Sequence, residues 1–423
     1  MADNTHSSSY IPRIVDAELQ LMLSALGAVL VEGPKWCGKT RTSLEAVSSA
    51  FYVMDNKELA LELPDVALTG DTPRLIDEWQ LAPKLWDRAR RHIDDRAQPG
   101  QFIFAGSSTP RSEKPSHSGT GRFAQLKMRT MSLFESGESN GSVSLKALFD
   151  QTQSSFTESA LQDIDTLVWS LARGGWPASL SLPKEAVTIL PKSYLRSIET
   201  ADLSLPDEET GAWNAQKISL LIKAIARNVS TTAGVTTLAR DVKERAGVLS
   251  RKTAALYLNV LKDLFFLEEQ PAWSVSLRSK AILRQSPKLH LADPSLAVAA
   301  LDASPEKLLQ DIWTLGLLFE SLCYRDVSVY SQALEGSIYH YLDSDGLEID
   351  QIVSLHNGKW GAIEVKLGDS QIDKAATQLI SFADKVNTDA IGEPAFLMIL
   401  YAGKYAYQRG DGVYVVPIGC LGP

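Results

Sequence analysis

The sequence has few cysteines and no long apolar segment, and each shortage excludes a class of protein. Its three cysteines, Cys37, Cys323 and Cys420, show no CxxC spacing, which argues against a disulfide framework and a structural zinc site. No apolar run reaches the roughly 18 residues that a membrane-spanning helix needs, so we expect no membrane association. Residues 1–9 are polar, unlike a secretory signal, and predict a flexible tail. The expected location is the cytoplasm.

Positive charge is also scarce over the whole chain. The 42 Lys and Arg residues stand against 51 Asp and Glu residues, a net charge of −9, which argues against a surface covered with nucleic-acid-binding charge. The distribution is uneven, however. Residues 217–290 carry 13 basic and 5 acidic groups, residues 1–216 carry 21 and 28, and residues 291–423 carry 8 and 18. A basic middle between acidic flanks indicates a separate functional surface there.

The 423 residues are too many for one ordinary domain, and their pattern divides them into three parts. In the first part, short apolar strands alternate with helical patterns, which predicts an α/β fold with a parallel sheet. The expected strands are residues 28–31, 51–54, 75–76 and 102–104, and the expected helices are residues 15–26, 39–49 and 83–97. Residues 106–121 are predicted as a loop, and the Ser-rich residues 136–160 as an insertion or flexible connection. The expected boundaries are a tail at 1–9 and domains at 10–205, 211–292 and 293–423.

A glycine-rich motif follows the first expected strand. From Gly33 to Thr40 the chain reads GPKWCGKT, a full match to GxxxxGK[ST] between a strand and a helix. Glycines let backbone N–H groups surround phosphates, and the helix N-terminus adds positive potential. Lys39 would contact the β- and γ-phosphates of ATP, and the Thr40 hydroxyl would bind Mg²⁺. The expected nucleotide-binding residues are Gly33, Pro34, Lys35, Trp36, Cys37, Gly38, Lys39, Thr40 and Arg41. A chance glycine turn is the alternative, which the strand and helix context disfavours.

Further polar groups follow the later strands. Asp77 and Glu78 end the third strand, where Asp77 would hold Mg²⁺ and Glu78 would polarise the attacking water. A strand placed between this pair and the phosphate loop is typical of ATPases with a catalytic glutamate. Ser107, or its neighbour Ser108, would sense the γ-phosphate, with a plain Ser-rich loop as the alternative. Arg122 would act as an arginine finger, in cis or across a subunit interface, or it is a surface arginine.

The basic middle has the pattern of a winged helix. Residues 236–245 and 250–264 predict two helices joined by a turn, with Ser250 as the N-cap of the second. Residues 265–273 and 288–291 predict two short strands. The second helix, with Arg251 and Lys252, could then enter a major groove. We expect DNA contact through residues 236–292, with a helical bundle that contacts no nucleic acid, or a protein-binding module, as the alternatives.

The C-terminal part contains a D…ExK pattern. Asp350 and Glu364 are separated by a segment with Asn357-Gly358, a hairpin signal that brings the two acids together on adjacent strands. Two carboxylates that hold Mg²⁺, with Lys366 positioning water, are the layout of metal-dependent nucleases. Glu320 or Glu335, which precede this hairpin in the sequence, would add a third carboxylate. Gln378, which follows it, would be a further residue of the site. The alternative is an ordinary hairpin with one salt bridge, and the acidic balance of this part argues against a strong DNA cleft of its own.

Taken in order, these motifs resemble a family of prokaryotic AAA-like ATP-binding proteins with a C-terminal domain of unknown function. The segments that carry the resemblance read GPKWCGKT, LIDEWQLAP, FIFAGSS, GTGR, RGGWP, PKLHLADPSL, EID and IEVK. The resemblance implies a P-loop ATPase core, a winged-helix-like region and a restriction-endonuclease-like end of the PD-(D/E)XK type. It implies nucleotide chemistry at Lys39, Thr40, Asp77 and Glu78, and a nuclease-like motif at Asp350, Glu364 and Lys366.

Two functions are consistent with these patterns. The first is a Mg²⁺-dependent ATPase that couples its nucleotide state to a DNA-directed winged-helix and nuclease-like module. The second is a nucleotide-dependent switch whose nuclease-like domain is inactive and binds a protein partner or a second copy of the chain.

Overall fold

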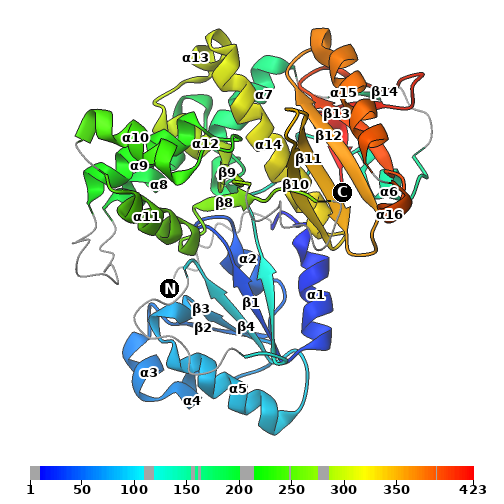
Figure 1. Ribbon diagram of the computed structural model, residues 1–423. Coiled ribbons are helices and arrows are strands. Elements are labelled where there is room, and N and C mark those ends of the chain that lie inside the picture. Colours follow the sequence, from blue (N-terminus) through cyan, green and yellow to red (C-terminus); the bar gives the residue numbers. More distant parts are fainter. Residues whose placement is uncertain are drawn as a thin grey trace. The chain divides into compact units, whose positions relative to one another are not determined.

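The structure, a computed structural model, forms two compact units (Figure 1). It describes residues 10–108, 119–153, 158–160, 163–200, 214–246, 249–274, 285–386 and 388–423. The N-terminal unit contains Met1–Arg129 with Asp263–Phe265, and the C-terminal unit contains Thr130–Lys262 and Phe266–Pro423. The division at residue 130 differs from the expected one at 205, because the helices that follow residue 160 pack within the C-terminal unit. The expected tail, residues 1–9, lies outside the described residues.

The N-terminal unit is built on a five-stranded parallel sheet in the order β2-β3-β4-β1-β5. The strands are β1 (Ala28–Glu32), β2 (Ser49–Tyr52), β3 (Arg74–Asp77), β4 (Phe102–Gly106) and β5 (Phe123–Lys127). The first four are confirmed within two residues of the expected positions, and β5 follows the expected loop. Strand β4 lies between β1 and β3, so the expected strand between the glycine loop and the acidic pair is confirmed.

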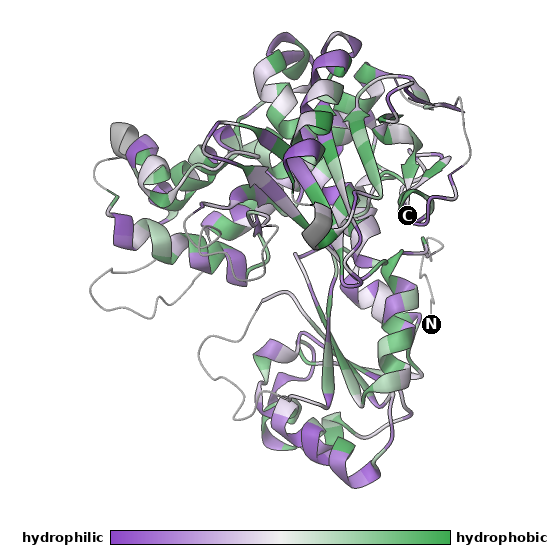
Figure 2. Ribbon diagram, turned by 45° about the vertical axis from the view of Figure 1, so that its right-hand side comes forward, coloured by the Kyte–Doolittle hydropathy of each residue, from purple (hydrophilic) through white to green (hydrophobic). Residues whose placement is uncertain are grey.

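Helices cover both faces of this sheet because every central strand is apolar on both sides. Alternate residues of β1 enter different cores, Ala28 and Leu30 in one and Val29 and Val31 in the other. The first core includes the aromatic residues Trp79, Trp86, Phe102 and Phe104 and lies under α3 (Lys57–Glu62), α4 (Pro64–Ala67) and α5 (Lys84–Arg96). The second lies under α1 (Val15–Ala25) and α2 (Lys39–Leu44). Figure 2 shows that hydrophobic colouring concentrates on the strands.

The C-terminal unit contains a helical part and a two-stranded hairpin. Its helices include α7 (Ile164–Arg173), α8 (Ile189–Glu199), α9 (Ala215–Arg227), α10 (Val235–Ala246), α11 (Arg251–Asp263), α12 (Pro294–Ala300) and α13 (Pro305–Gln310). Strands β8 (Leu267–Gln270) and β9 (Lys288–Leu291) pair antiparallel. The two helices and two strands predicted in the basic middle are therefore present. The Ser250 hydroxyl accepts from the backbone N–H of Thr253 at 3.0 Å, as expected of an N-cap.

A seven-stranded sheet forms the rest of the C-terminal unit, in the order β10-β11-β12-β13-β15-β14-β7. The long helix α14 (Ile312–Gln332) precedes β10 (Gly336–Leu342), β11 (Glu348–Leu355) and β12 (Trp360–Lys366), and α15 (Ile372–Lys385) leads to β13 (Phe396–Tyr401). Strands β10 to β12 are antiparallel, whereas β12 and β13 are parallel. Strands β14 (Tyr405–Gln408) and β15 (Tyr414–Pro417) extend the sheet, and Figure 1 shows α14 and α15 beside its central strands.

The expectation of a flexible connection at residues 136–160 is wrong for its described part. This stretch contributes β6 (Val143–Ser144), α6 (Leu145–Phe149) and β7 (Glu158–Ser159). Strand β6 pairs with β16 (Leu421–Gly422), and β7 pairs with β14. Few apolar residues suffice for this docking, since Leu145, Leu148 and Phe149 are almost fully buried. Backbone hydrogen bonds from β6 to β16 and from β7 to β14 also hold this stretch in place. Amino-acid composition does not reveal such backbone pairing.

A buried ionic cluster joins segments of the C-terminal unit that are far apart in sequence. Asp293, fully buried, accepts hydrogen bonds from the backbone N–H of Gly175 at 3.0 Å and the Thr130 hydroxyl at 2.8 Å. Arg325 donates to Asp293 at 3.1 Å and to the neighbouring Asp326 at 2.7 Å. Two sequence motifs of the resemblance, RGGWP and PKLHLADPSL, thus meet at a structural cluster. In the described part of the chain, no helix is both long and apolar enough to span a membrane.

Candidate functional site

The glycine loop between β1 and α2 has the backbone that phosphate binding requires. Gly38 takes a positive φ of 106° at the N-cap of α2, which favours glycine. A side chain at Gly33 would lie 2.1 Å from the carbonyl oxygen of Met128, so the loop packs too tightly for a larger residue there. Cys37 is fully buried. Arg13 donates to its carbonyl oxygen at 2.8 Å and so fixes the loop from outside.

The charged and polar groups of the loop are held by contacts within the same unit. The Lys39 ammonium is buried and donates to the carbonyl oxygens of Gly33 and Pro34 at 2.9 and 2.7 Å. The ammonium group is therefore enclosed by the backbone of its own loop. The Thr40 hydroxyl lies 3.1 and 3.2 Å from the two carboxylate oxygens of Asp77. A hydroxyl beside a carboxylate is the hard oxygen donor set that Mg²⁺ prefers, so these two residues fit the ion. Burial raises the pKa of Asp77, while the Thr40 hydroxyl counteracts that effect.

The second acid of the pair is held by two polar side chains. Glu78 follows β3 with a positive φ of 53°, an uncommon conformation for a residue other than glycine. Its carboxylate accepts from Gln80 and, at 3.4 Å, from the Ser107 hydroxyl at the end of β4. Ser107 is nearly buried. The structure therefore brings Glu78 and Ser107 together at the carboxyl edge of the sheet, where Asp77 also ends its strand.

Arg122 is not brought to this site. The residue precedes β5, and Phe123 pairs with Ala28 at the start of β1, whereas the glycine loop follows the end of β1. Five residues of strand separate these edges, roughly 16 Å. Arg122 instead pairs with Asp94 on α5 at 2.9 Å, with both side chains partly exposed. A cis arginine finger is excluded by this arrangement of the unit, and a role in trans stays a prediction.

The flank of the glycine loop is exposed. Trp36 is 47% exposed with a positive φ of 64°. Arg41 pairs with Glu45 one helical turn later at 2.7 Å and lies over the ring of Tyr10. The nucleotide-binding role expected of Trp36 and Arg41 stays a prediction.

A second constellation forms in the C-terminal unit. Hairpin pairing of β11 with β12 places Gln351 opposite Ile363, so Asp350 lies opposite Glu364 one step further. Lys366 on β12 contacts both acids, Glu364 at 2.5 Å and Asp350 at 3.6 Å. Gln378 on α15 donates to Glu364 at 3.3 Å. The hairpin signal therefore brought the D…ExK residues together as expected.

Of the two glutamates considered as a third carboxylate, only Glu320 belongs to this site. It lies on α14, within 2.8 Å of a residue that sequence reasoning missed, Lys288 on β9. The Lys288 ammonium also lies 2.8 Å from Glu348 and 3.5 Å from Asp350. Glu335 lies elsewhere and pairs with His356 on the surface. We call Lys288, Glu320, Glu348, Asp350, Glu364 and Lys366 the acidic cluster.

Burial and mutual contacts shift the titration of these groups. Burial, with the nearby Asp350 carboxylate, raises the pKa of Glu320 and of Glu364 to about 8. Burial would also raise the pKa of Asp350, but the ammonium groups of Lys288 and Lys366 outweigh it and hold that pKa below its usual range. The pKa of Lys288 is raised because the carboxylates around it outweigh its own burial.

The acidic cluster does not fit a divalent cation in this arrangement. Each carboxylate oxygen of Asp350 and Glu364 already has an N–H donor: Lys288 at Oδ1 and the backbone of Val365 at Oδ2 of Asp350, and Lys366 and Gln378 on Glu364. Over the described residues, no three His, Cys, Asp or Glu side chains converge as a metal-binding group. We therefore derive no metal-dependent step at the acidic cluster.

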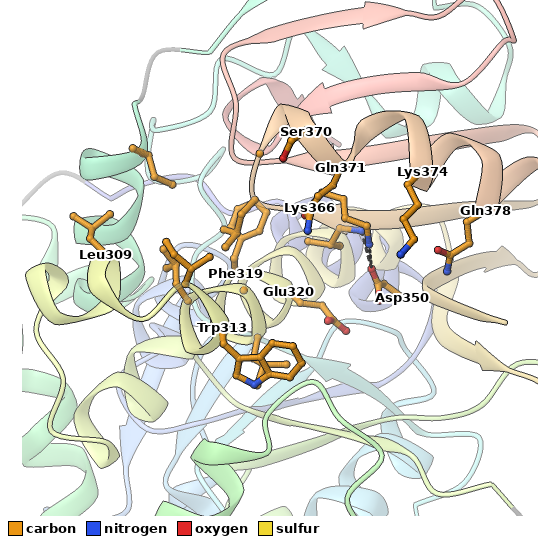
Figure 3. Close-up of a pocket in the computed structure, with 18 residues that line it drawn as sticks. Leu309, Trp313, Phe319, Glu320, Asp350, Lys366, Ser370, Gln371, Lys374 and Gln378 are labelled. Atoms are coloured by element: carbon orange, nitrogen blue, oxygen red, sulfur yellow. Dashed lines mark hydrogen bonds and ion pairs between the residues drawn. The ribbon is translucent and has the colours of Figure 1, made fainter. Parts of the chain in front are cut away.

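The cluster opens into a cavity of about 710 Å³ (Figure 3). Lys366, Lys374 and Gln378 line one side, and Trp313, Phe319 and Glu320 line the other. Trp313 is 80% exposed at its rim. The cavity thus combines a charged floor with an apolar wall, as ligand pockets do.

Comparisons with known proteins match the chain in three segments. Residues 27–136 match a family described as an AAA domain, residues 164–307 match a domain of unknown function (DUF8612), and residues 315–421 match another (DUF4143). No curated protein matches the chain. A Walker-type ATPase of Pyrococcus abyssi is 12% identical, with a TM-score of 0.43, over 69% of this chain and 96% of its own. The ORC1 protein of Aeropyrum pernix, solved in complex with DNA, is 14% identical, with a TM-score of 0.25, over 72% and 97%.

The family match and the geometry agree for the N-terminal unit. The AAA match spans the sheet, the glycine loop and the Asp77–Glu78 pair. The structural likenesses are too weak to carry an argument about the remainder. Residues 27–136 are thus an AAA-like P-loop domain of the nucleotide-binding ATPase type, within a chain of mixed α/β fold.

Proposed function

We propose that the chain is a Mg²⁺-dependent ATPase that binds ATP in the loop from Gly33 to Thr40. The contact between Thr40 and Asp77 carries the proposal, because it brings together the oxygen donors that the ion needs. Mg²⁺ bound there would neutralise charge on the β- and γ-phosphates. Lys39 would leave the carbonyl oxygens of its own loop and donate to the phosphates instead.

Glu78 and Ser107 have the remaining roles in this proposal. The Glu78 carboxylate would orient the attacking water and accept its proton, since it stands at the end of β3 one strand away from the loop strand β1. Its present hydrogen bonds to Gln80 and Ser107 hold it at the sheet edge. The Ser107 hydroxyl would contact the γ-phosphate, so that one side chain touches both the nucleotide and the base.

Two variants separate binding from hydrolysis. We expect Lys39→Ala to lose ATP binding, measured with a fluorescent ATP analogue. Glu78→Gln should still bind ATP but hydrolyse it roughly 10² to 10⁴ times more slowly. Lys84→Ala, an exposed lysine of the same unit, is the matched control. Full hydrolysis by Lys39→Ala would sink the proposal.

The nucleotide state would act on a DNA-directed module made of α9, α10, α11 and the β8–β9 hairpin. Three helices followed by a hairpin are the element order of a winged helix, and residues 217–290 carry the chain's basic excess. Arg251 and Lys252 are exposed at the N-terminus of α11. Tyr257 of α11 is buried, so it contributes to the core of the module.

Salt-dependent binding tests this part. We expect Arg251→Glu with Lys252→Glu to weaken binding to a DNA duplex and to lower the slope of log affinity against log salt by about 2, one for each charge removed. Lys223→Glu, on α9 of the same segment, is the control. An unchanged slope would favour a protein-binding module.

The order α14, β10, β11, β12, α15, β13, with Asp350 and Glu364 on the middle hairpin, supports a restriction-endonuclease-like fold for the last domain. Because every oxygen of that acid pair has an N–H donor, the inactive, switch-like alternative is favoured over nuclease activity. Incubation of DNA with the full chain and Mg²⁺ or Mn²⁺ distinguishes the two alternatives. We expect no cleavage of the DNA. Cleavage that the Asp350→Ala substitution abolishes would establish nuclease activity. In the switch alternative, the cavity beside the cluster would hold a partner protein or a second copy.

A further inference from the structure

The acidic cluster contains a cation of its own. The side chain of Lys288 is 2% exposed, and its ammonium group lies within 3.5 Å of Glu320, Glu348 and Asp350. Three carboxylates from two elements, Glu320 on α14 and Glu348 and Asp350 on β11, converge on this one nitrogen. An ammonium group surrounded by carboxylate oxygens has the charge and the donor geometry that complete such a site without a metal ion.

The lysine is held in this position by a second layer of contacts. Lys288 pairs with Gln270 across the hairpin. The Gln270 amide donates to the carbonyl oxygen of Asp350 at 2.8 Å and to that of Tyr339 at 2.9 Å, which ties the hairpin to β10 and β11. The ring of His290 contacts Gln270 at 3.0 Å and Ser321 on α14 at 3.2 Å. Lys288 is therefore a built component of the cluster.

We infer that the Lys288 ammonium takes the place that a divalent cation occupies in a two-carboxylate nuclease site, so that the folded chain keeps its acidic cluster free of metal. The comparison with a nuclease rests on the restriction-endonuclease-like fold proposed above, whereas the cation itself is a feature of this chain. A divalent ion prefers six or more oxygen ligands at 2.0–2.6 Å. It could collect them here only after the ammonium group leaves.

Lys288 belongs to the β8–β9 hairpin, and the carboxylates belong to α14 and β11. Removal of the Lys288 ammonium group would take away one positive charge and free oxygens of Glu320, Glu348 and Asp350 together. Lys366, by contrast, lies on the same strand as Glu364.

Manganese binding to the nucleotide-free full-length chain tests the inference. Mn²⁺ alone is titrated and the bound ion is counted by electron paramagnetic resonance, with Asp350→Asn in each background to identify ions held by the cluster. We expect no Asp350-dependent ion in the unmodified protein up to about 1 mM, the range of weak protein sites. Lys288→Met should create one that binds at least about a hundredfold more tightly, because a unit charge a few ångströms from the ion is removed. Lys374→Met, an exposed lysine of the same cavity, is the control and should behave as the unmodified protein.

Thermal unfolding gives an independent readout. Lys288→Met leaves three carboxylates without their counter-ion, so we expect a lower melting temperature that Mn²⁺ restores, whereas Mn²⁺ should leave the Lys374→Met protein unchanged. If Lys288→Met does not fold without metal, Lys288→Met with Glu320→Gln, which removes one of the three acidic groups, takes its place in both titrations.

Two results would overturn the inference. One is an Asp350-dependent manganese ion in the unmodified protein, which would mean that metal and lysine coexist. The other is a folded Lys288→Met protein that gains no manganese site. Neither result depends on ATP hydrolysis, so the inference and the proposed ATPase can fail separately.

Discussion

Removal of the Asp293 carboxylate should destabilise the C-terminal unit more than any change on its surface. Asp293 is fully buried, and the Arg325 guanidinium and nearby N–H groups outweigh its burial and hold its pKa below the usual value. It is therefore ionised in the folded chain. Asp293→Ala would leave Arg325 with Asp326 alone and would orphan the N–H of Gly175 and the hydroxyl of Thr130.

The expected loss follows from these contacts. Removing one partner of a buried ion pair costs about 3–5 kcal/mol, and the orphaned groups at Gly175 and Thr130 set the value in the upper part of that range. Asp293→Asn keeps the shape and part of the hydrogen bonding, so we expect a smaller loss. The control Asp302→Ala removes an exposed partner of Lys192 and should cost at most about 1 kcal/mol.

Urea unfolding measures the effect. Each unit contains buried tryptophans, Trp79 and Trp86 in the N-terminal unit and Trp176 and Trp360 in the C-terminal unit. Fluorescence and circular dichroism must be fitted with a transition for each unit, because a two-unit chain need not unfold in one step. A double-mutant cycle with Arg325→Met should show a coupling energy of roughly 1–3 kcal/mol. A loss below about 1 kcal/mol for Asp293→Ala would refute the reasoning, since the ion pair would then contribute no more than a surface pair.

Three further predictions test other parts of the chain. Gly175→Ala should reduce the stability of the C-terminal unit by at least about 1–3 kcal/mol in urea unfolding, since its new methyl group would lie 2.1 Å from the Met131 carbonyl oxygen; unchanged stability would show that this backbone can move. Burial lowers the pKa of His290 to about 3, below its unfolded value, so the unfolded chain takes up the proton first as the pH falls. The stability difference between the unmodified protein and His290→Gln should therefore shrink by about 2 kcal/mol between pH 7 and pH 5, and a constant difference would contradict this. Arg122→Ala should leave steady-state ATP hydrolysis nearly unchanged, whereas a loss of about 10³-fold would show that Arg122 acts as an arginine finger from another subunit.

The nucleotide site could be predicted from sequence because its parts are local. The glycine loop is continuous from Gly33 to Thr40, and its backbone conformation follows from glycine positions within eight residues. Asp77 and Glu78 end a strand, and parallel strands end at one edge, so an acidic pair after β3 must lie near a loop after β1. The same argument shows why Arg122 was misplaced for a cis role, since it precedes its strand and lies at the opposite edge.

The acidic cluster was predictable only in the part that one hairpin determines. The turn at Asn357-Gly358 fixes the register that sets Asp350 against Glu364. Glu348 lies two residues before Asp350, so the two side chains are on the same face of the strand. Nothing in the local sequence shows that Glu348 and Glu320 would contact the same lysine. That arrangement depends on how α14 packs on the sheet, which is a long-range property.

The place of Lys288 in the acidic cluster could not be predicted from the sequence. Lys288 belongs to the basic segment 217–290, which the count of charges marked as a DNA-binding surface. Of the 13 basic residues at 217–290, this one is buried against three carboxylates of the segment that counting described as acidic. Its charge therefore contributes nothing to a DNA-binding surface and neutralises part of the neighbouring excess. The net charge of a segment describes its surface only when the charged side chains are exposed. The expected domain boundary at residue 293 also separated Lys288 from the carboxylates that it contacts. The hairpin consequently belongs both to the basic segment and to the acidic cluster.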